Sequence, residues 1–298
     1  MVKISYTIVD VFAEQQYTGN QLAVVHPGVI LSKEEMQTIA REFHFSETTF
    51  ILSDTPRDGG YDIRIFTPAE EVPFAGHPTI GTAYVIQQEI IKSHIEKIIL
   101  HEKAGDIPVT FSKTTHGSKL LWMEQLSPTF GMTYDAATIA ALLGITTQDI
   151  DSRYLIQMVS TGLPFIIVPL KTLAAVKRAK LQLSSYTRLL KTADAQAVLL
   201  FCAEPYNPAH HLNARMFADE LGVTEDPATG SANGCLAAYL VEYEYFGKSH
   251  IEIQVEQGYE ILRPSVLHLN VWKDEGRFHI HVGGQVVHIA NGELFHQT

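Results

Sequence analysis

Apolar and polar residues alternate over Met1–Val9, and this period of two is typical of a β-strand with one buried face. Leu22–His26 reads as the hairpin partner of that strand, and segments 45–52 and 62–66 show the same strand character. Several strands are therefore predicted in the first quarter of the chain.

One amphipathic helix interrupts these strands. Ser32 and Glu35 have the spacing of a capping box, in which each side chain satisfies a backbone N–H of the other. Apolar residues then recur at i, i+3, i+4 and i+7, which predicts one buried stripe and a helix that ends near His44: Met36, Ile39, Ala40 and Phe43.

Two further helical segments, Thr79–Ile90 and Cys235–Tyr243, have a different pattern. Small and aliphatic side chains surround almost the whole circumference of each. A helix that is apolar all round belongs inside a protein, so each is predicted to be enclosed by the strands before and after it.

The segments that lead into these two helices resemble each other. Arg64-Ile65-Phe66 precedes the Gly-rich turn with Gly76, and Arg215-Met216-Phe217 precedes the turn with Gly230. The offsets nearly agree, since 215 − 64 = 151 and 230 − 76 = 154. This indicates an internal duplication, with halves at 1–117 and 118–298, of mixed α+β character rather than regular βαβ alternation. A site where the halves meet would receive two helix N-termini.

Composition narrows the function classes. The 298 residues are 46% hydrophobic and 18% charged, as in a soluble globular protein, and the net charge is −11. That charge disfavours nucleic acid and anionic membranes as partners. The longest apolar run, Leu163–Leu170, is too short to span a membrane, and Met1–Val9 lacks a signal-peptide core, so a cytoplasmic location is expected.

Cysteine and histidine suggest no disulfide framework and no metal. Cys202 and Cys235 each lie in an apolar run and are expected to be buried and reduced. His279 and His281 share a strand face but lack the third ligand of a zinc site.

The two Gly-rich turns are candidate anion sites. Gly76-His77-Pro78 and Gly230-Ser231-Ala232 each place small residues and free N–H groups at a helix start, where a carboxylate meets donors and a positive dipole end. Neither turn has the spacing of a P-loop or of a dinucleotide site, so no nucleotide cofactor is expected.

Three ionisable residues could add chemistry at these turns. His77 stands at a helix start, where the dipole should lower its pKa and favour the neutral ring. Asp226 precedes Ser231 by five residues on the matching loop. Glu47 begins a predicted strand, and its spacing alone does not distinguish it from a surface residue.

Several short motifs occur in one order along most of the chain: Asp10-Val11-Phe12, Gly19-Asn20, Ser46-Glu47-Thr48-Thr49-Phe50, Arg64-Ile65-Phe66-Thr67-Pro68, Ala75-Gly76-His77-Pro78-Thr79, and Glu225-Asp226-Pro227-Ala228-Thr229-Gly230-Ser231-Ala232. In these the chain resembles the PhzF family, the phenazine-biosynthesis isomerase and its homologues, which share the diaminopimelate epimerase-like fold.

The resemblance implies a fold and a site. Each half would be a mostly antiparallel sheet or barrel curled around a central helix, with the active site in the cleft between the halves and commonly a homodimer. Glu47 would be the general acid/base of a cofactor-independent isomerase, moving a proton between carbons of a small carboxylic acid. The residues implied to bind that substrate are Gly76, His77, Asp226, Gly230 and Ser231.

The chain departs from diaminopimelate epimerase at the helix starts. Ala75 and Pro227 stand in the regions where that enzyme has two facing cysteines, which disfavours a two-thiol racemase. Two alternatives stay open: an epimerase or racemase of an amino or hydroxy acid that uses other bases, and a non-catalytic protein that binds small carboxylates. The residues that would select the substrate carry no readable signature.

Overall fold

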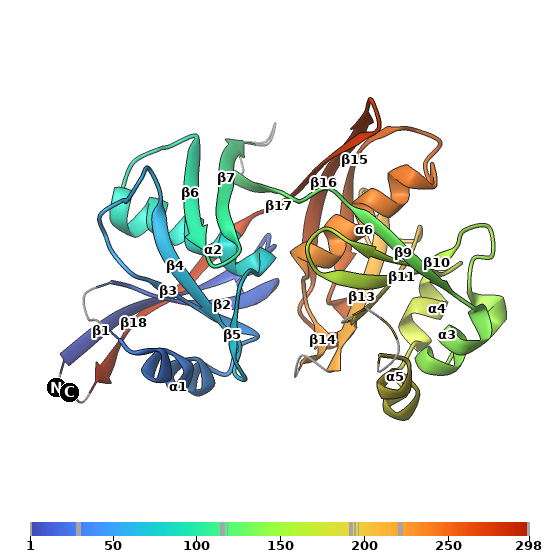
Figure 1. The fold of residues 1–298 in the computed structure, drawn as a ribbon, viewed down its shortest axis with the longest axis horizontal. Helices are drawn as coiled ribbons and strands as arrows, with labels where there is room; N and C mark the ends of the chain where they lie inside the picture. The colour runs from blue at the N-terminus through green and yellow to red at the C-terminus, as the bar shows by residue number, and fades with distance from the viewer. Residues whose placement is uncertain are drawn as a thin grey trace. The chain divides into compact units, whose positions relative to one another are not determined.

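A computed structural model describes residues 2–27, 31–113, 117, 119–190, 193, 195, 197–219 and 223–296. The chain divides into two compact units, one made of Met1–Glu124 with Gly283–Thr298 and the other of Gln125–Val282 (Figure 1). Ser118, where we expect the second half to begin, lies outside the described residues.

The first unit contains strands from both ends of the chain. Its elements are β1 (Val2–Val11), β2 (Asn20–Val25), α1 (Lys33–Phe43), β3 (Glu47–Ile51), β4 (Tyr61–Phe66), β5 (Glu71–Val72), α2 (Gly76–Val85), a π-helical turn (Ile86–Ile91), β6 (Lys97–Glu102), β7 (Gly105–Lys113), β8 (Lys119–Glu124) and β18 (Val286–His296). β18 pairs antiparallel with β1, from Val2 opposite His296 to Val11 opposite Val286.

The capping box at the start of α1 is confirmed. Ser32 accepts a hydrogen bond from the backbone of Glu35, and the Glu35 carboxylate accepts one from the backbone of Ser32. Met36 and Ala40 are buried as the stripe predicts, and the helix ends at His44 in the left-handed conformation.

The second unit repeats the mixture of strands around one helix. Its elements are β9 (Thr129–Tyr134), α3 (Ala136–Leu143), a 3₁₀ turn (Thr147–Asp149), β10 (Ile156–Ser160), β11 (Pro164–Pro169), α4 (Leu173–Arg178), α5 (Leu183–Leu190), β12 (Ala197–Cys202), β13 (Leu212–Ala218), β14 (Val223–Asp226), α6 (Gly230–Glu242), β15 (His250–Gln257), a 3₁₀ turn (Tyr259–Ile261), β16 (Ser265–Asp274) and β17 (Arg277–Gly284, which runs into the first unit).

The two units share one order of strand pairing. In the first, β1–β2 is antiparallel, β2–β3 parallel, β3–β4 antiparallel, β4–β6 parallel and β6–β7 antiparallel. In the second, β10–β11, β11–β12, β12–β13, β13–β15 and β15–β16 repeat this series in the same sense. This agreement supports the duplication inferred from the sequence.

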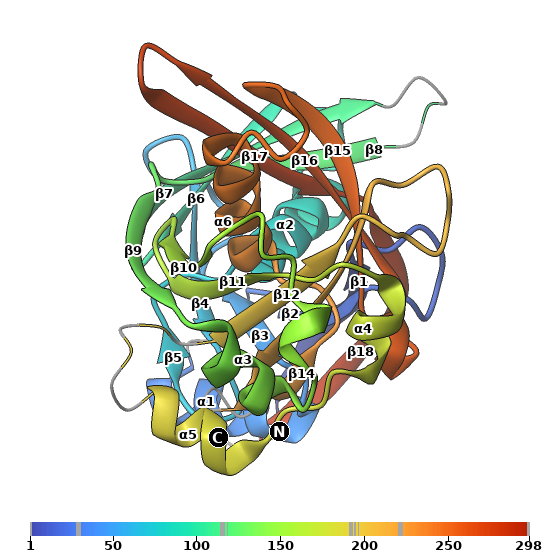
Figure 2. The same cartoon turned by 90° about the vertical axis from the view of Figure 1, so that its right-hand side faces the viewer.

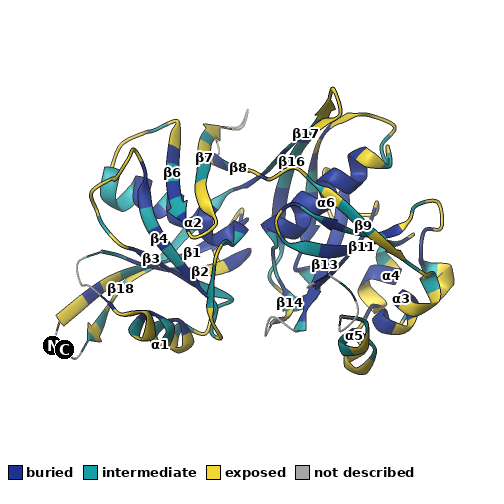
Figure 3. Cartoon of the chain, in the orientation of Figure 1, coloured by how far each residue is buried: buried dark blue, intermediate teal, exposed yellow. Residues whose placement is uncertain are grey.

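Each unit encloses one apolar helix, as the sequence predicts. α2 contacts β1, β2 and β3, and α6 contacts β10, β11 and β16, alongside which it runs in Figure 2. Both helices are buried over nearly their whole length, which Figure 3 shows as dark blue. Each helix start is therefore fixed by the strands of its own unit.

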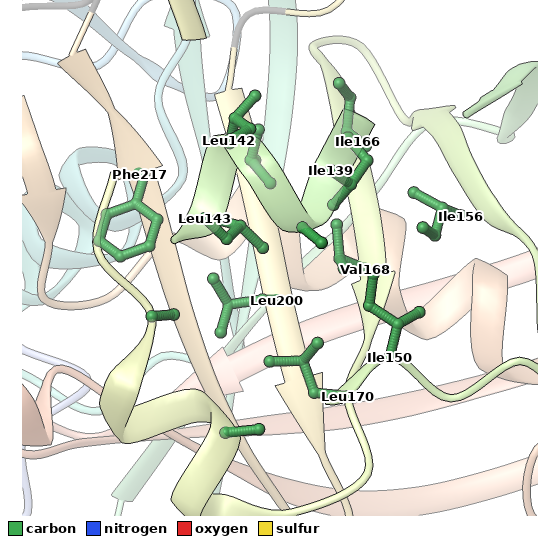
Figure 4. Packing of buried hydrophobic residues seen from close by; sticks show 14 of the residues in the cluster. Ile139, Leu142, Leu143, Ile150, Ile156, Ile166, Val168, Leu170, Leu200 and Phe217 are labelled. Atoms are coloured by element: carbon green, nitrogen blue, oxygen red, sulfur yellow. The ribbon is translucent and has the colours of Figure 1, made fainter. Parts of the chain in front are cut away.

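The remaining helices of the second unit cover an outer apolar core. Ile139, Leu142 and Leu143 of α3 face Ile166 and Val168 of β11 (Figure 4). No helix among the described residues is both long and apolar enough to cross a membrane.

Candidate active site

The duplicated Arg-x-Phe motif builds the same ion pair in each unit. Arg64 donates two hydrogen bonds to the carboxylate of Glu71, at 2.8 and 3.0 Å, and Arg215 donates two to Glu225, at 2.8 and 2.7 Å. Such paired Arg–carboxylate bonds fix orientation as well as charge. In each unit they tie the strand to the segment that leads toward the central helix.

Helix α2 begins without a capping side chain. Ala75 is its N-cap and makes no side-chain hydrogen bond to the first turn, so the N–H groups of that turn are not used by a cap. Gly76 and His77 are the first two helical residues, and both are buried. The helix start therefore offers donors and a positive dipole end beside the His77 ring.

Glu47 and His77 lie together in the first unit. Glu47 is the first residue of β3, and its Oε2 is 3.5 Å from Nε2 of His77. The side chain of His77 is 5% exposed and that of Glu47 is 19% exposed. The Glu47 side chain is therefore partly exposed, although its Oε2 is buried, and the imidazole is almost fully enclosed.

His77 is a neutral ring. Burial lowers the pKa of His77 to about 3, and a hydrogen bond with the backbone of Gln21 only partly opposes this. The sequence predicts the same direction from the helix dipole, but loss of solvent is the larger cause. At neutral pH His77 can donate or accept one hydrogen bond without carrying charge.

Asn20 lies against Nδ1 of the His77 ring. Asn20 Nδ2 is 3.2 Å from that nitrogen, and when Asn20 donates to it the ring hydrogen resides on Nε2, 3.5 Å from Glu47 Oε2. Asn20 follows Gly19, whose φ of +69° and close approach to the backbone of Val11 exclude a side chain. The Gly19-Asn20 motif thus places the residue that orients His77, a role that the sequence analysis did not assign.

The second unit holds Asp226, Gly230 and Ser231 on one loop and helix start. Asp226 ends β14, and its Oδ2 accepts a hydrogen bond from the Thr229 hydroxyl at 2.5 Å. Gly230 and Ser231 are the first two residues of α6, whose N-cap Thr229 makes no side-chain bond to the first turn. The helix start is built like that of α2.

Gln257 fixes this loop and was also missed by sequence reasoning. Its Nε2 donates to the carbonyl of Asp226 at 2.8 Å and to the Thr229 hydroxyl at 3.1 Å. Its Oε1 accepts from Thr229 N at 3.3 Å and from Asn233 Nδ2 at 2.9 Å. A lone Gln at the end of a strand carries no motif, and only its place opposite the helix start reveals the role.

The structure thus brings together Glu47, Gly76 and His77 in the first unit, and Asp226, Gly230 and Ser231 in the second. Cys235 lies within α6 rather than at its start, and burial raises the pKa of its thiol to about 12. A thiol held so firmly in its neutral form is a poor base.

Histidines of the second unit do not form a metal cluster. His279 and His281 both stack against Trp272, with ring centroids 4.8 and 5.4 Å apart. Within the described part of the chain, no group of three or more His, Cys, Asp or Glu side chains has the arrangement of a metal site.

Comparison with known proteins gives matches over almost the whole chain. The family model described as phenazine biosynthesis-like protein (PhzC-PhzF) matches residues 9–292. The trans-2,3-dihydro-3-hydroxyanthranilate isomerase of Pseudomonas aeruginosa is 35% identical over 260 residues, which cover 87% of each chain.

Solved structures also match this chain over almost its whole length. The crystal structure of the Bacillus anthracis phenazine biosynthesis protein of the PhzF family has 30% identity and a TM-score of 0.91, covering 99% of this chain and 100% of that one. A probable proline racemase from Agrobacterium radiobacter shares the fold, with a TM-score of 0.67 at 9% identity over 98% of this chain and 93% of that one. The fold class implied by the resemblance is confirmed.

Proposed function

This chain belongs to the phenazine biosynthesis-like (PhzC-PhzF) family and is an isomerase, and we propose that it moves a proton between two carbon atoms of a small carboxylic acid, with Glu47 as the general acid and base. The observation that carries this proposal is the position of the Glu47 carboxyl. Its Oε2 is 3.5 Å from a neutral buried imidazole, on a partly exposed side chain in the same unit as a helix start that no side chain caps.

The proposed reaction keeps every atom. Ionised Glu47 removes a proton from one carbon, and the electron pair of that C–H bond forms a new double bond to the neighbouring carbon while the electrons of the existing double bond move along the conjugated system. The protonated Glu47 then returns the proton to a carbon further along the conjugated system. The carboxylate is regenerated, nothing is oxidised or reduced, and general acid/base catalysis of this kind contributes about 10²–10⁴-fold.

His77 supports this cycle without exchanging a proton itself. Its Nε2 lies 3.5 Å from Glu47 Oε2, and a hydrogen on that nitrogen can stabilise the carboxylate or a polar group of the substrate. Because the pKa of His77 is about 3, the ring does not compete with Glu47 as a base above that pH.

The substrate carboxylate is proposed to bind at the donors of the helix starts. Each helix start is a candidate for that role by itself: Gly76 and His77 in the first unit, and Gly230 and Ser231 in the second, where Asp226 can accept from a polar group of the substrate. The activity named for the Pseudomonas aeruginosa relative favours a cyclic substrate with an allylic C–H bond.

The test is isotope exchange. The protein is screened by thermal shift against cyclic and acyclic amino and hydroxy carboxylic acids, and each hit is followed by proton NMR in D₂O. We expect deuterium at one substrate carbon and a shifted double bond. An epimerase would instead invert a stereocentre and leave the double bonds in place, and a binding protein would stabilise without exchange.

Two variants test whether Glu47 is the general acid and base. Glu47→Gln should lower the exchange rate by about 10²-fold or more while the protein keeps its melting temperature. Glu42→Gln is the matched control, because Glu42 is an exposed carboxylate on α1. Exchange by Glu47→Gln at the rate of the Glu42→Gln control would overturn the proposal.

A further inference from the structure

The two central helices begin with the same polar contact. In α2 the hydroxyl of Thr79 donates to the carbonyl of Ala75 at 2.8 Å. In α6 the Asn233 amide donates to the carbonyl of Thr229 at 3.0 Å. Ala75 and Thr229 are the two N-caps, and the offsets agree, since 233 − 79 = 154 and 229 − 75 = 154.

A strand-end side chain completes this contact in each unit. Glu102 is the last residue of β6, and its Oε1 lies 2.5 Å from Thr79 Oγ1. Gln257 is the last residue of β15, and its Oε1 accepts from Asn233 Nδ2 at 2.9 Å. β6 and β15 pair in parallel with β4 and β13, which occupy the same place in the two units.

The two contacts differ in the number of hydrogens that the helix side chain can donate. The Asn233 amide has two N–H groups and can donate to Thr229 and to Gln257 at once. The Thr79 hydroxyl has one hydrogen, and the Ala75 carbonyl can only accept. When the Thr79 hydroxyl donates its hydrogen to the Ala75 carbonyl, it has none left for Glu102. The short contact between Thr79 Oγ1 and Glu102 Oε1 is then a hydrogen bond only if the Glu102 carboxyl carries the hydrogen and donates it to Thr79.

The environment of the second carboxyl oxygen of Glu102 also favours a protonated side chain. Its Oε2 is buried and has no hydrogen-bond partner among the described residues, so a negative charge there would lack compensation. Burial raises the pKa of Glu102 to about 8. A Thr79 hydroxyl that donates to the carboxylate opposes this rise, whereas one that accepts from Glu102 favours the protonated acid further.

Charges on the elements packed against β6 do not neutralise this group. α2, β4 and β7 contact β6, and their ionisable residues, with those of β6 and its turn, are His77, Tyr84, Tyr61, Asp62, Arg64, Lys97, His101, Lys103, Asp106 and Lys113. Three of these have other partners: Asp62 binds Arg57, Arg64 binds Glu71, and His101 binds Asp106. None contributes to the pKa of Glu102.

We propose that Glu102 is a positioning residue that works as a neutral carboxylic acid and holds the first turn of α2 in the way that the amide of Gln257 holds the first turn of α6. Its hydrogen bond to Thr79 fixes Gly76 and His77 relative to Glu47. The catalytic meaning of that placement rests on the proposed function, whereas the protonation of Glu102 does not.

The experiment compares the wild type with Glu102→Gln and Glu102→Ala. Gln can donate to Thr79 at every pH, so Glu102→Gln should keep kcat within about 3-fold of the wild type near pH 7. As the pH rises, the wild type should lose activity with a midpoint near the Glu102 pKa of about 8, because Glu102 ionises there. Glu102→Gln should not show this loss. Glu102→Ala should lose about 10-fold or more in kcat at every pH.

A second measurement is independent of turnover. Carbon-13 NMR of glutamate carboxyl groups should show one that titrates near pH 8 in the wild type and is missing in Glu102→Gln. A Glu102 that titrates in the ordinary carboxyl range, or a Glu102→Gln variant as impaired as Glu102→Ala, overturns the inference. If the carboxyl titrates near pH 8 while Glu47→Gln keeps full exchange, the proposed function fails and the protonation of Glu102 stands.

Discussion

His77 Nε2 and Glu47 Oε2 are both buried and lie 3.5 Å apart, although the two residues come from a helix start and a strand start 30 positions apart in sequence. The contact joins a group that can exchange protons with one that keeps a fixed protonation state.

His77 should stay neutral throughout the physiological range. Because burial lowers its pKa to about 3, nitrogen-15 NMR should show no protonation of this ring between about pH 5 and 9. In the unfolded chain the ring takes up a proton below about pH 6.5, so stability should fall as the pH drops from there toward 3, by up to about 1.4 kcal/mol per pH unit. A His77 midpoint near the ordinary value would contradict this.

Exchanging the donor on Asn20 for an acceptor should move the hydrogen of the His77 ring from Nε2 to Nδ1. Asn20→Asp puts a carboxylate oxygen at Nδ1, which then carries the hydrogen and leaves the lone pair of Nε2 facing Glu47. We expect a drop in kcat of about 10-fold or more, because a lone pair replaces a donor beside the Glu47 carboxylate, and a hydrogen bond to a charged group is worth about 1.5–3 kcal/mol. Nitrogen-15 shifts report the tautomer directly, and an unchanged Nε2–H form would show that Asn20 does not set it.

Replacing Gln257 by a carboxylic acid should lower the stability of the protein. Gln257→Glu loses at least one of the two donors that reach Asp226 and Thr229, and its ionised form loses both. Stability should therefore fall as the pH rises, by about 3 kcal/mol or more in total once the carboxyl is ionised. Urea unfolding at several pH values measures this. Gln254→Glu on the same strand, where the side chain is only partly buried, is the control and should change stability little.

Gly19 should be irreplaceable for steric reasons. A Cβ at Gly19 would collide with the Val11 carbonyl and approach the Ala13 side chain to 2.7 Å, whereas one at Gly59 meets nothing within 4 Å. Both glycines have positive φ, so Gly59→Ala should cost about 1–2 kcal/mol for the backbone conformation alone. Gly19→Ala should cost about 2–5 kcal/mol, since overpacking is added. Equal losses in thermal unfolding would show that the close approach is relieved.

Much of the fold follows from local sequence. The capping box at Ser32 and the all-round apolar helices at 79–90 and 235–243 depend on neighbours in the chain, and the structure contains all three. The first apolar helix starts at Gly76, three residues earlier than its pattern suggests, and both Gly76 and His77 are buried.

The supporting contacts of the site depend on distant residues and could not be predicted. Asn20 and His77 are 57 positions apart, and Thr79 and Glu102 are 23 apart. The duplication was visible at Arg64 and Arg215, yet their partners Glu71 and Glu225 follow at unequal distances, 7 and 10 residues on. Loops of different length between matching strands hide such pairs from comparison of the sequence with itself.

The pairing of β18 with β1 has a consequence for how the chain is made. The second unit is continuous in sequence and can collapse on the ribosome once residue 282 has emerged. The first unit is synthesised earlier, yet β1 must wait with one edge unpaired until the last strand arrives. The half of the molecule that carries Glu47 is thus begun first and finished last.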